Sequence, residues 1–495
     1  MIAFKPAAIF GNHMVVCRDK ELRIFGQAED GTVITATLQG KKGVAKASNG
    51  RFLVLLPPLA AATDAVLSLS DGNTTYQYTD VAIGDVFLAG GQSNMELALE
   101  NANEGEQCIK DHEDSLLRFY RVPVSGVWDD EAKQKESETR WQMVAPNECG
   151  DVSAAAYFFA QKVREEENVP VGIVECYLGG TMISCWLDEM ALCQTPQGKA
   201  CLEAFDETNR MGKEAYDLAY EKYIIDHPAW EKRAEEIKTE QPDIDWMKLN
   251  ELAGQCPWPP PMGYRSPYRP NGLAQTMLDR IVPYTLTGIL YYQGESDDKQ
   301  PDDYHALLMT LVLHWRHLFM DAHLPFMSVQ LPMYGCDGKP DGDQWARIRL
   351  AQTRVNQSLR HCGLAITIDR GDEKDVHPTD KRVIGERLYQ QARQLVYGKT
   401  GLNAPEVTAK YTVNDTLVAA FSQPLVCLDA EPRLFEIADE RGIYQRAKAC
   451  ITGGSVSLSA EGIAYPTCVR YAYVNWGIVN VFGENGLPLA PFVME

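Results

Sequence analysis

The first 80 residues alternate apolar and polar positions in short runs that are separated by turn residues. Asp30-Gly31 and Asn49-Gly50 stand between these runs, and such pairs are typical of tight turns between strands. The clearest runs are ELRIF (21–25), TVITATL (32–38) and RFLVLL (51–56). The pattern predicts a small β-sandwich-like domain over residues 1–80.

From Asp85 onward the pattern changes to apolar runs that alternate with segments of helical period. The apolar runs are 85–89, 171–177, 287–292, 326–330 and 364–368. Strands that are apolar on both faces are typical of a parallel sheet that helices cover on both sides. Residues 153–166 and 304–319 have the period of such helices. We therefore expect an α/β domain over residues 81–398.

Two further segments depart from this alternation. Residues 200–252 are charged and helical in period, and the proline-rich stretch PWPPP follows at 257–261. This composition predicts a helical insertion at about 200–256. After Gly398 strand-like runs resume and predict a β-rich domain over residues 399–495. The clearest of these runs are 416–421 and 455–459.

The composition is that of a globular protein, with 45% apolar and 23% charged residues among 495. The formal net charge of −21 would repel phosphate backbones, so we expect no nucleic-acid partner. No run approaches the roughly 18 apolar residues of a membrane span, so we expect no membrane partner. The opening MIAFKPAAIF lacks the apolar core of a signal peptide.

Thirteen cysteines are scattered along the chain without any CxxC pair. Several of them, such as Cys176 and Cys427, lie within apolar runs. Free thiols in a reducing compartment account for this pattern better than a disulfide framework or a zinc site. The pattern therefore predicts a cytoplasmic protein.

The segment DVFLAGGQSNME (85–96) ends a buried strand with two glycines and a serine. Gly90 and Gly91 allow a sharp turn that presents Ser93 at the carboxyl end of the strand, where open α/β sheets place their sites. At the start of a helix, the N–H of Ser93 can point at an anion. The same residues also fit an ordinary helix N-cap after a turn. Ser93 is therefore a candidate nucleophile that needs support from elsewhere in the chain.

A second candidate is His377, in the loop DEKDVHPTD (372–380) that follows the predicted strand 364–368. A histidine at the carboxyl end of a strand can reach the first site. Asp375 lies two residues before it, and a catalytic histidine needs a carboxylate that fixes its tautomer. On its own, such a loop is more often surface decoration.

Two further loops offer oxyanion donors. In YYQGESD (291–297), Gln293 has a side-chain N–H, and Glu295 can orient neighbours or the substrate. Gly179-Gly180, after the strand 171–177, offers backbone N–H groups. Together the four loops supply a nucleophile, a base, a carboxylate and oxyanion donors, which is the set that acyl transfer requires.

The motifs GGQSNME, GGTMISCW, YYQGESD and DVHP resemble the conserved blocks of the sialate O-acetylesterase group of the SGNH hydrolase superfamily. The stretches FGNHMVVCRDKELRIFGQA and RYAYVNWGIVNVFGENGLPLAPF are similar to that group's N-terminal β-domain and C-terminal signature. The resemblance implies an α/β fold with an SGNH-type, flavodoxin-like parallel sheet flanked by helices, and β-sandwich-like accessory domains at both ends of the chain. It also implies a carbohydrate O-acetylesterase, a serine carboxylic-ester hydrolase that needs no metal or cofactor.

By that resemblance Ser93 is the nucleophile, His377 the base and Asp375 the acid of a Ser-His-Asp acyl-enzyme mechanism. The implied oxyanion hole consists of Ser93, Gly179, Gly180 and Gln293. The wider superfamily has an aspartate three residues before the histidine, but Lys374 occupies that position here. Asp372 or Asp369 is therefore an alternative acid, and a Ser–His dyad is another.

Contacts to the substrate, an O-acetylated sugar or oligosaccharide, are expected from neighbours of these loops and from aromatic and arginine side chains. The expected residues are Gln92, Asn94, Glu295, Trp186, Arg269 and Trp345. Trp258 and Tyr264 are further candidates for stacking on sugar rings, and Arg265 and Arg347 for pairing with a sugar carboxylate. Packing and surface roles are the commoner fates of such side chains.

The sequence leaves several alternatives open. The acetyl ester can belong to sialic acid or to a plant glycan such as xylan or mannan. A noncatalytic carbohydrate-binding protein is an alternative of another class, and a metal-dependent hydrolase that uses His314 and His317 is a third. The oligomeric state, a homo-oligomer included, is also open.

Overall fold

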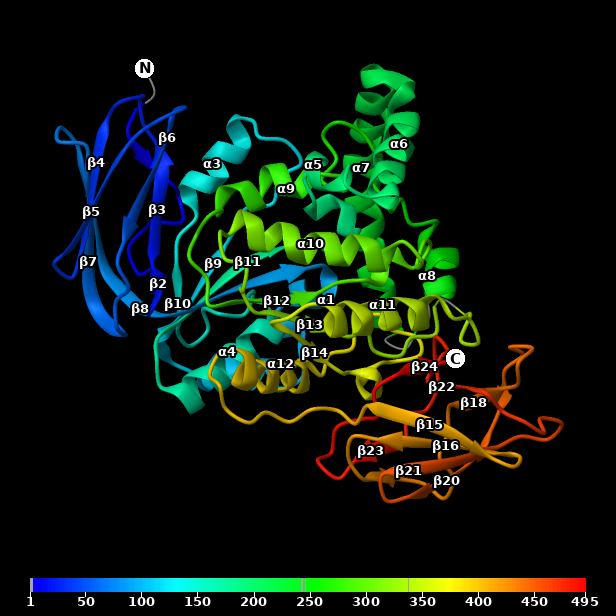
Figure 1. Cartoon of the computed structure of the whole chain (residues 1–495). Helices are drawn as coiled ribbons and strands as arrows, with labels where there is room; N and C mark the ends of the chain where they lie inside the picture. The colour runs from blue at the N-terminus through cyan, green and yellow to red at the C-terminus, as the bar shows by residue number, and fades with distance from the viewer. Residues whose placement is uncertain (1–2, 242–243, 245, 337) are drawn as a thin grey trace.

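A central sheet with helices on both faces forms the middle of the chain, and smaller β-sheets lie at its two ends (Figure 1). The computed structural model describes residues 3–241, 244, 246–336 and 338–495. Spatially, the strands of the central sheet run β10 (Gln142–Val144), β9 (Asp114–Arg121), β11 (Val171–Tyr177), β8 (Thr75–Gly91), β12 (Gly288–Tyr292), β13 (Phe326–Val329) and β14 (Cys362–Ala365). All neighbours from β9 to β14 pair in parallel, and β10 pairs antiparallel with β9.

The buried strands follow the apolar runs of the sequence closely. Every residue of β11 and β12 is buried, as expected for strands with helices on both sides. The predicted strand 364–368 is the exception, because β14 ends at Ala365. Beyond it the Thr367 hydroxyl donates to the carbonyl of Gln330, and a 3-10 turn begins at Ile368.

Four long helices cover the sheet, two on each face (Figure 1). α4 (Ala154–Glu167) packs against α12 (Lys381–Leu395) on one face, and α10 (Tyr304–Leu318) packs against α11 (Gln344–Ser358) on the other. The α4–α12 crossing is close, because a Cβ on Gly385 would lie 2.5 Å from the backbone nitrogen of Phe159. Residue 385 therefore has to be a glycine if α12 is to keep its position above the sheet.

Two small sheets form the N-terminal part of the chain. β1 (Lys5–Pro6), β3 (Leu22–Gln27) and β6 (Arg51–Leu56) form one of them. The other contains β4 (Val33–Leu38), β5 (Lys41–Lys46), β7 (Ala62–Ser70) and the first half of β8, which also pairs with β2 (Val15–Cys17). The predicted boundary between residues 80 and 81 falls inside β8, so one continuous strand joins this region to the central sheet.

The last ninety residues form further small sheets. Their strands are β15 (Val407–Val413), β16 (Thr416–Phe421), β17 (Leu425–Cys427), β18 (Phe435–Ala438), β19 (Gln445–Arg446), β20 (Lys448–Thr452), β21 (Ser455–Ser459), β22 (Cys468–Tyr471), β23 (Val481–Gly483) and β24 (Phe492–Met494). Their hydrophobic core includes Leu364, Ile366 and Ile368 from the edge of the central sheet. This C-terminal region is therefore packed against the α/β domain.

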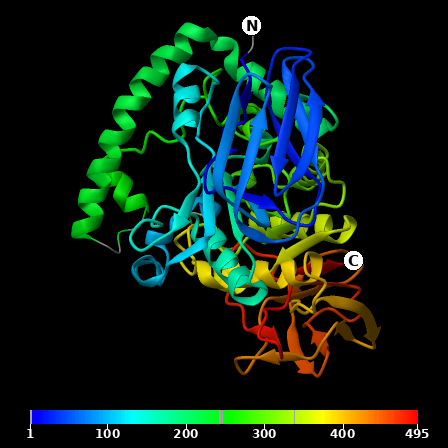
Figure 2. The same ribbon diagram turned by 90° about the vertical axis from the view of Figure 1, so that its left-hand side faces the viewer.

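The predicted helical insertion consists of α6 (Pro196–Thr208), α7 (Gly212–Glu240) and α8 (Trp246–Ala253). Figure 2 shows α7 in green as a long helix along the outside of the molecule. No helix of the described residues is long and apolar enough to cross a membrane. The thirteen cysteines, all within the described residues, form no disulfide there.

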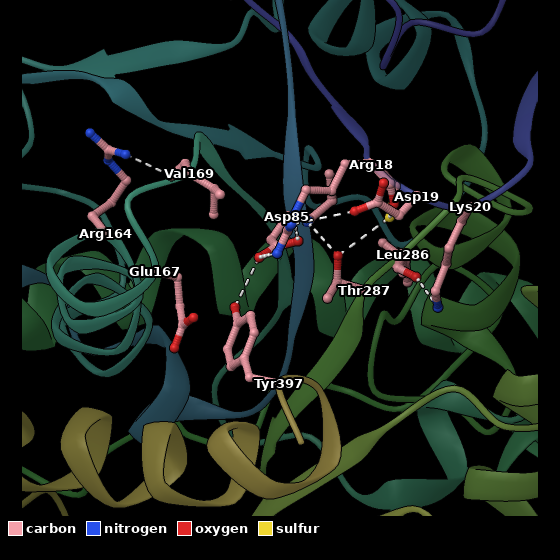
Figure 3. Close-up of polar contacts among 12 residues, drawn as sticks. Arg18, Asp19, Lys20, Asp85, Arg164, Glu167, Val169, Leu286, Thr287 and Tyr397 are labelled. Atoms are coloured by element: carbon pink, nitrogen blue, oxygen red, sulfur yellow. Dashed lines mark hydrogen bonds and ion pairs between the residues drawn. The ribbon is translucent and has the colours of Figure 1, made fainter. Parts of the chain in front are cut away.

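Asp85 joins three parts of the fold within the buried half of β8, where the pairing with β11 begins (Figure 3). Its carboxylate is 3% exposed and accepts hydrogen bonds from Nε and Nη2 of Arg18 at 2.8 and 3.2 Å. The hydroxyl of Tyr397, which follows α12, donates to the same carboxylate at 3.0 Å. Because a buried carboxylate needs such partners, the three side chains hold the N-terminal sheets against the α/β domain.

We expect Arg18→Met to destabilise the protein by roughly 3 kcal/mol, because the buried Asp85 carboxylate then lacks its cationic partner. The methionine keeps an apolar stem of similar length, so the loss reports the charge. Equilibrium urea unfolding measures the effect.

Asp19→Asn is the matched control, because Asp19 is the exposed carboxylate that pairs with the same arginine at 3.3 Å. An exposed pair contributes at most about 1 kcal/mol, so this variant should unfold close to wild type. Equal stabilities of the two variants would contradict the structural role of the Arg18–Asp85 pair.

Candidate active site

The loops that follow β8, β11, β12 and β14 meet around one cavity of about 900 Å³. β8 lies between β11 and β12, which come from different parts of the chain. Connections on the two sides of such a strand diverge and leave a crevice at its carboxyl end. All four motifs singled out in the sequence lie at this edge of the sheet.

The structure brings Ser93 and His377 together. Ser93 begins the short helix α1 (Ser93–Glu96), and its Oγ lies 2.8 Å from Nε2 of His377, 284 positions along the chain. The turn before it requires Gly91, which has φ +136° and whose Cβ would lie 2.0 Å from the carbonyl oxygen of Tyr292. A hydroxyl in hydrogen-bond contact with an imidazole is the arrangement that activates a serine.

Asp375 is near His377, but it does not have the geometry of a triad acid. One of its carboxylate oxygens accepts the backbone N–H of His377 at 2.8 Å. The same oxygen lies 4.0 Å from Nδ1 of the imidazole, which is too far for a hydrogen bond, and the carboxylate is 64% exposed. Asp375 therefore fixes the loop backbone and acts on the ring only through its charge.

Asp372 and Asp369, the alternative acids, bind other groups. Asp372 accepts the backbone N–H groups of Lys374 and Asp375 at 2.7 and 2.9 Å, which shapes the loop. Asp369 is buried in ion pairs with Arg387 and Arg370. Of the three carboxylates, Asp375 is the one that the structure places beside His377.

The sequence predicted a substrate contact for Asn94, but this side chain lies beneath the site and does not line the cavity. It is fully buried, and its Nδ2 donates to Oε1 of Glu295 at 2.7 Å and to the carbonyl of Val376 at 2.9 Å. Its Oδ1 accepts from Nζ of Lys381 at 2.6 Å. Since Asn94 follows Ser93 and Val376 precedes His377, this amide ties the nucleophile loop to the base loop.

The charged groups on either side of Asn94 are both shifted by burial. Burial lowers the pKa of Lys381 to about 7, although Glu295 opposes the shift. Burial also raises the pKa of Glu295, opposed by the hydrogen bond from Asn94. Lys381 was not predicted as a site residue, and its position as the first residue of α12, four after His377, was the available signal.

Gln92 fastens a second loop to the nucleophile. Its Nε2 donates to Oγ of Ser296 at 3.1 Å, and its Oε1 accepts the backbone N–H groups of Gly294 and Ser296. Gln92 and Glu295 both line the cavity but are almost fully buried. Their hydrogen bonds assign them to positioning the loops.

Gln293 does not have the position of the oxyanion donor that the sequence predicted. Gln293 is fully buried outside the cavity lining, and its Nε2 donates to the carbonyl of Thr181 at 3.0 Å and to Asp297 at 2.6 Å. An amide with both N–H groups engaged has none to offer an oxyanion. The structure therefore assigns Gln293 to holding two loops together.

Glu96, which was not predicted as a site residue, binds the backbone N–H of Gly179, one of the expected oxyanion donors. Its carboxylate accepts the backbone N–H of Gly179, and a Cβ on Gly179 would lie 2.9 Å from Oε2 of Glu96 and 3.2 Å from Cβ of Ser93. Burial raises the pKa of Glu96, opposed by the Gly179 N–H. The signal was its position three residues after Ser93, which places both on one face of the helix.

Two of the expected substrate contacts bind other parts of the protein. Trp186 is fully buried, donates from Nε1 to Oγ1 of Thr181 and packs edge-on against Trp315. Arg269 donates to the backbone carbonyls of Ser266 and Gly126. Neither residue lines the cavity.

The remaining candidates divide between the cavity and the surface. Arg265 and Arg347 pair with Asp129 and Asp302 away from the cavity, and Tyr264 donates to Asp217. Trp345 and Trp258 do line the cavity. Its other aromatic residues are Trp246, Tyr268 and Tyr334.

His314 and His317, the pair considered for a metal site, do not line the active-site cavity. His314 lies on α10, with its Nε2 3.1 Å from Oδ2 of Asp188. No group of three or more His, Cys, Asp or Glu side chains is arranged to hold a metal ion within the described part of the chain.

Comparisons with known proteins point to one family. A family model described as "Carbohydrate esterase, sialic acid-specific acetylesterase" matches residues 83–208 and 269–394. The sialate O-acetylesterase of Mus musculus is 25% identical, with 100% of this chain and 95% of the mouse protein aligned. That of Homo sapiens is 23% identical, with 99% and 92% aligned.

One solved structure is similar along the whole chain. XAC1771, described as a novel carbohydrate acetylesterase from Xanthomonas citri, superposes with a TM-score of 0.78 at 26% identity, and 99% of each chain is covered.

Removing one of two nearby charges should shift the pKa of His377, in opposite directions for the two charges. Burial lowers its pKa below the ordinary 6.5, the charge of Lys238 lowers it further, and the charge of Asp375 raises it. We therefore expect Lys238→Gln to raise the pKa of His377 and Asp375→Asn to lower it. The asparagine keeps the acceptor for the His377 backbone N–H, so the loop is preserved. An NMR titration of the imidazole measures both shifts, and His377→Asn assigns the resonance. Shifts in the same direction would contradict this account of the site.

Proposed function

The chain belongs to the sialic acid-specific acetylesterase family of carbohydrate esterases, and we propose that it hydrolyses acetyl esters on sugar hydroxyls with Ser93 as nucleophile. The observation that carries this proposal is the 2.8 Å contact between Oγ of Ser93 and Nε2 of His377 at the edge of a large cavity. The parallel core and the placement of both residues at its carboxyl edge support the SGNH-type assignment.

His377 acts first as a base. Its Nε2 takes the Ser93 proton as Oγ attacks the acetyl carbonyl, and it then returns this proton to the departing sugar oxygen. In the second half of the cycle it activates a water that hydrolyses the acetyl-enzyme. Because burial lowers its pKa, His377 is neutral and ready to accept a proton near neutral pH.

The oxyanion is stabilised by backbone amides at the start of α1 and after β11. The N–H of Ser93 lies in the first turn of α1, whose amides have no partner inside the helix. The Gly179 N–H is the second donor of this proposal; in the structure it donates to the Glu96 carboxylate, so it reaches the oxyanion only in exchange for that hydrogen bond. Asp375 keeps the His377 loop in place and stabilises the imidazolium through its charge, so the reactive unit is a Ser–His pair with a nearby carboxylate.

The substrate class follows from the relatives, which are named sialate O-acetylesterases and a carbohydrate acetylesterase. We propose an O-acetylated sugar or oligosaccharide as substrate. The thirteen free cysteines support a cytoplasmic location.

We expect Ser93→Ala and His377→Ala each to lower kcat by roughly 10³-fold or more, because each removes one half of a unit that works together. Acetate release from O-acetylated sialic acid and from acetylated xylo- and manno-oligosaccharides measures the loss. Ser296→Ala, which changes another serine of the cavity lining that does not contact His377, should stay within about tenfold of wild type. Full activity of Ser93→Ala would exclude it as the nucleophile.

A further inference from the structure

One wall of the active-site cavity comes from a segment outside the family match. Residues 209–268 lie between the two matched stretches, 83–208 and 269–394, and contain α7 and α8. Their contributions to the cavity lining are Lys238, Trp246, Gln255, Cys256, Trp258 and Tyr268. The catalytic groups all come from the matched stretches, so this wall is an addition to the machinery that the family model describes.

Trp258 lies next to the catalytic groups. Gly180 has φ +71°, and a Cβ on it would lie 2.4 Å from Cζ2 of Trp258, so the indole packs directly on this turn. The preceding residue, Gly179, borders Ser93. Trp258 is nevertheless 41% exposed and lines the cavity. Its free face therefore borders the space that a sugar ring occupies when its acetyl group reaches Ser93.

Trp246 is held beside Trp258 by α7. The ring of His227 lies 6.2 Å from that of Trp258, and the ring of Trp230 lies 5.6 Å from that of Trp246. His227 and Trp230 are three residues apart, so they share one face of α7 with a rise of about 4.5 Å between them. Nε1 of Trp230 donates to the carbonyl of Gly254, which fixes its ring. Two indoles that both pack against this face of α7 thus line the same cavity.

Both indoles keep a large exposed area inside a concave site. Trp246 is 51% exposed, and large aromatic side chains in a cavity are typical of a binding surface. The apolar C–H face of a sugar ring stacks on such a side chain, while its hydroxyls find polar groups nearby. The cavity volume of about 900 Å³ is near the upper end of the range of roughly 300–1,000 Å³ for small-molecule sites, so it holds more than one ring.

The charges around the cavity favour a neutral sugar. No arginine among the described residues lines it, so the bidentate partner that a sugar carboxylate prefers is missing there. The lining contains the acidic residues Glu96, Glu295, Asp298 and Asp375 against the lysines Lys238 and Lys374. The buried Lys381 lies behind Glu295, and Asn94 bridges the two side chains. An anionic ring would therefore meet a surplus of negative charge.

We propose that residues 209–268 form an oligosaccharide subsite in which Trp258 stacks on the acetylated ring and Trp246 on the next ring of a neutral chain. This inference rests on the proposed acetylesterase function and specifies its substrate as an acetylated neutral oligosaccharide. The insertion thus adds chain-length selectivity to an acetyl-transfer site.

The test compares singly O-acetylated xylose, xylobiose and xylotriose that carry the acetyl group on the same sugar. For wild type we expect kcat/KM to rise roughly tenfold from xylose to xylobiose, the fold-change that one aromatic stacking contact provides. Trp246→Ala should reduce this ratio to near one, and Trp246→Phe should restore part of it. The ratio does not depend on the fraction of folded enzyme. Met247→Ala is the matched control, because Met247 is the next residue of α8, is 74% exposed and does not line the cavity.

Calorimetric binding of unacetylated xylobiose and xylotriose to Ser93→Ala provides a second readout that needs no turnover. Affinity that grows with chain length and depends on Trp246 would support the subsite, whether or not the enzyme cleaves the acetyl esters. Failure to cleave any of the esters would contradict only the proposed acetylesterase function. A wild-type ratio of one, a ratio that survives in Trp246→Ala, or a preference for O-acetylated sialic acid over acetylated xylobiose would overturn the inference.

Discussion

The active site depends on one buried amide, that of Asn94. Ser93 and His377, the proposed nucleophile and base, lie 284 positions apart, and the Asn94 side chain joins their loops by donating to the Val376 carbonyl. Its other partners are Glu295 and Lys381, both buried. Hydrogen bonds to charged groups contribute about 1.5–3 kcal/mol each, so this amide is stabilised in a single orientation. The orientation in turn fixes the distance between Ser93 and His377.

The buried charges around Asn94 explain how the rest of the fold supports this geometry. Lys381 begins α12, and its ammonium lies 5.1 Å from the ring of Tyr292, at the end of β12. α12 can hold this position because Gly385 lets it cross α4 closely. The position of Lys381 therefore depends on the packing of α12 against α4. It also links the end of β12 to the loop that contains His377. A charge at this depth is costly unless its partners are held in place, so the packing of the scaffold and the order of the site support each other.

The sequence predicted the parts of the molecule that follow from local pattern. Runs of apolar residues located β11 and β12 to within one residue, and the glycine turns located Ser93 and the loops around it. It did not predict side-chain direction, because that depends on partners far away in the chain. Gln293 turns away from the cavity toward Thr181, 112 positions earlier, and Arg269 is held by Gly126, 143 positions earlier.

The same reasoning explains why substrate contacts were the least predictable part of the site. Catalytic groups sit at the ends of buried strands, whose pattern is strong, whereas the aromatic wall belongs to a charged helical insertion with a weak pattern of its own. Its two cavity-lining indoles are positioned by residues elsewhere in the chain, Trp246 by Trp230 of α7 and Trp258 by His227 of α7 and the turn at Gly180. Loops and insertions on a rigid scaffold are where specificity generally changes, because they vary at little cost to the core. In the proposals made above, the scaffold accordingly supplies the acyl-transfer groups, and the insertion supplies the surface that selects the acetylated chain.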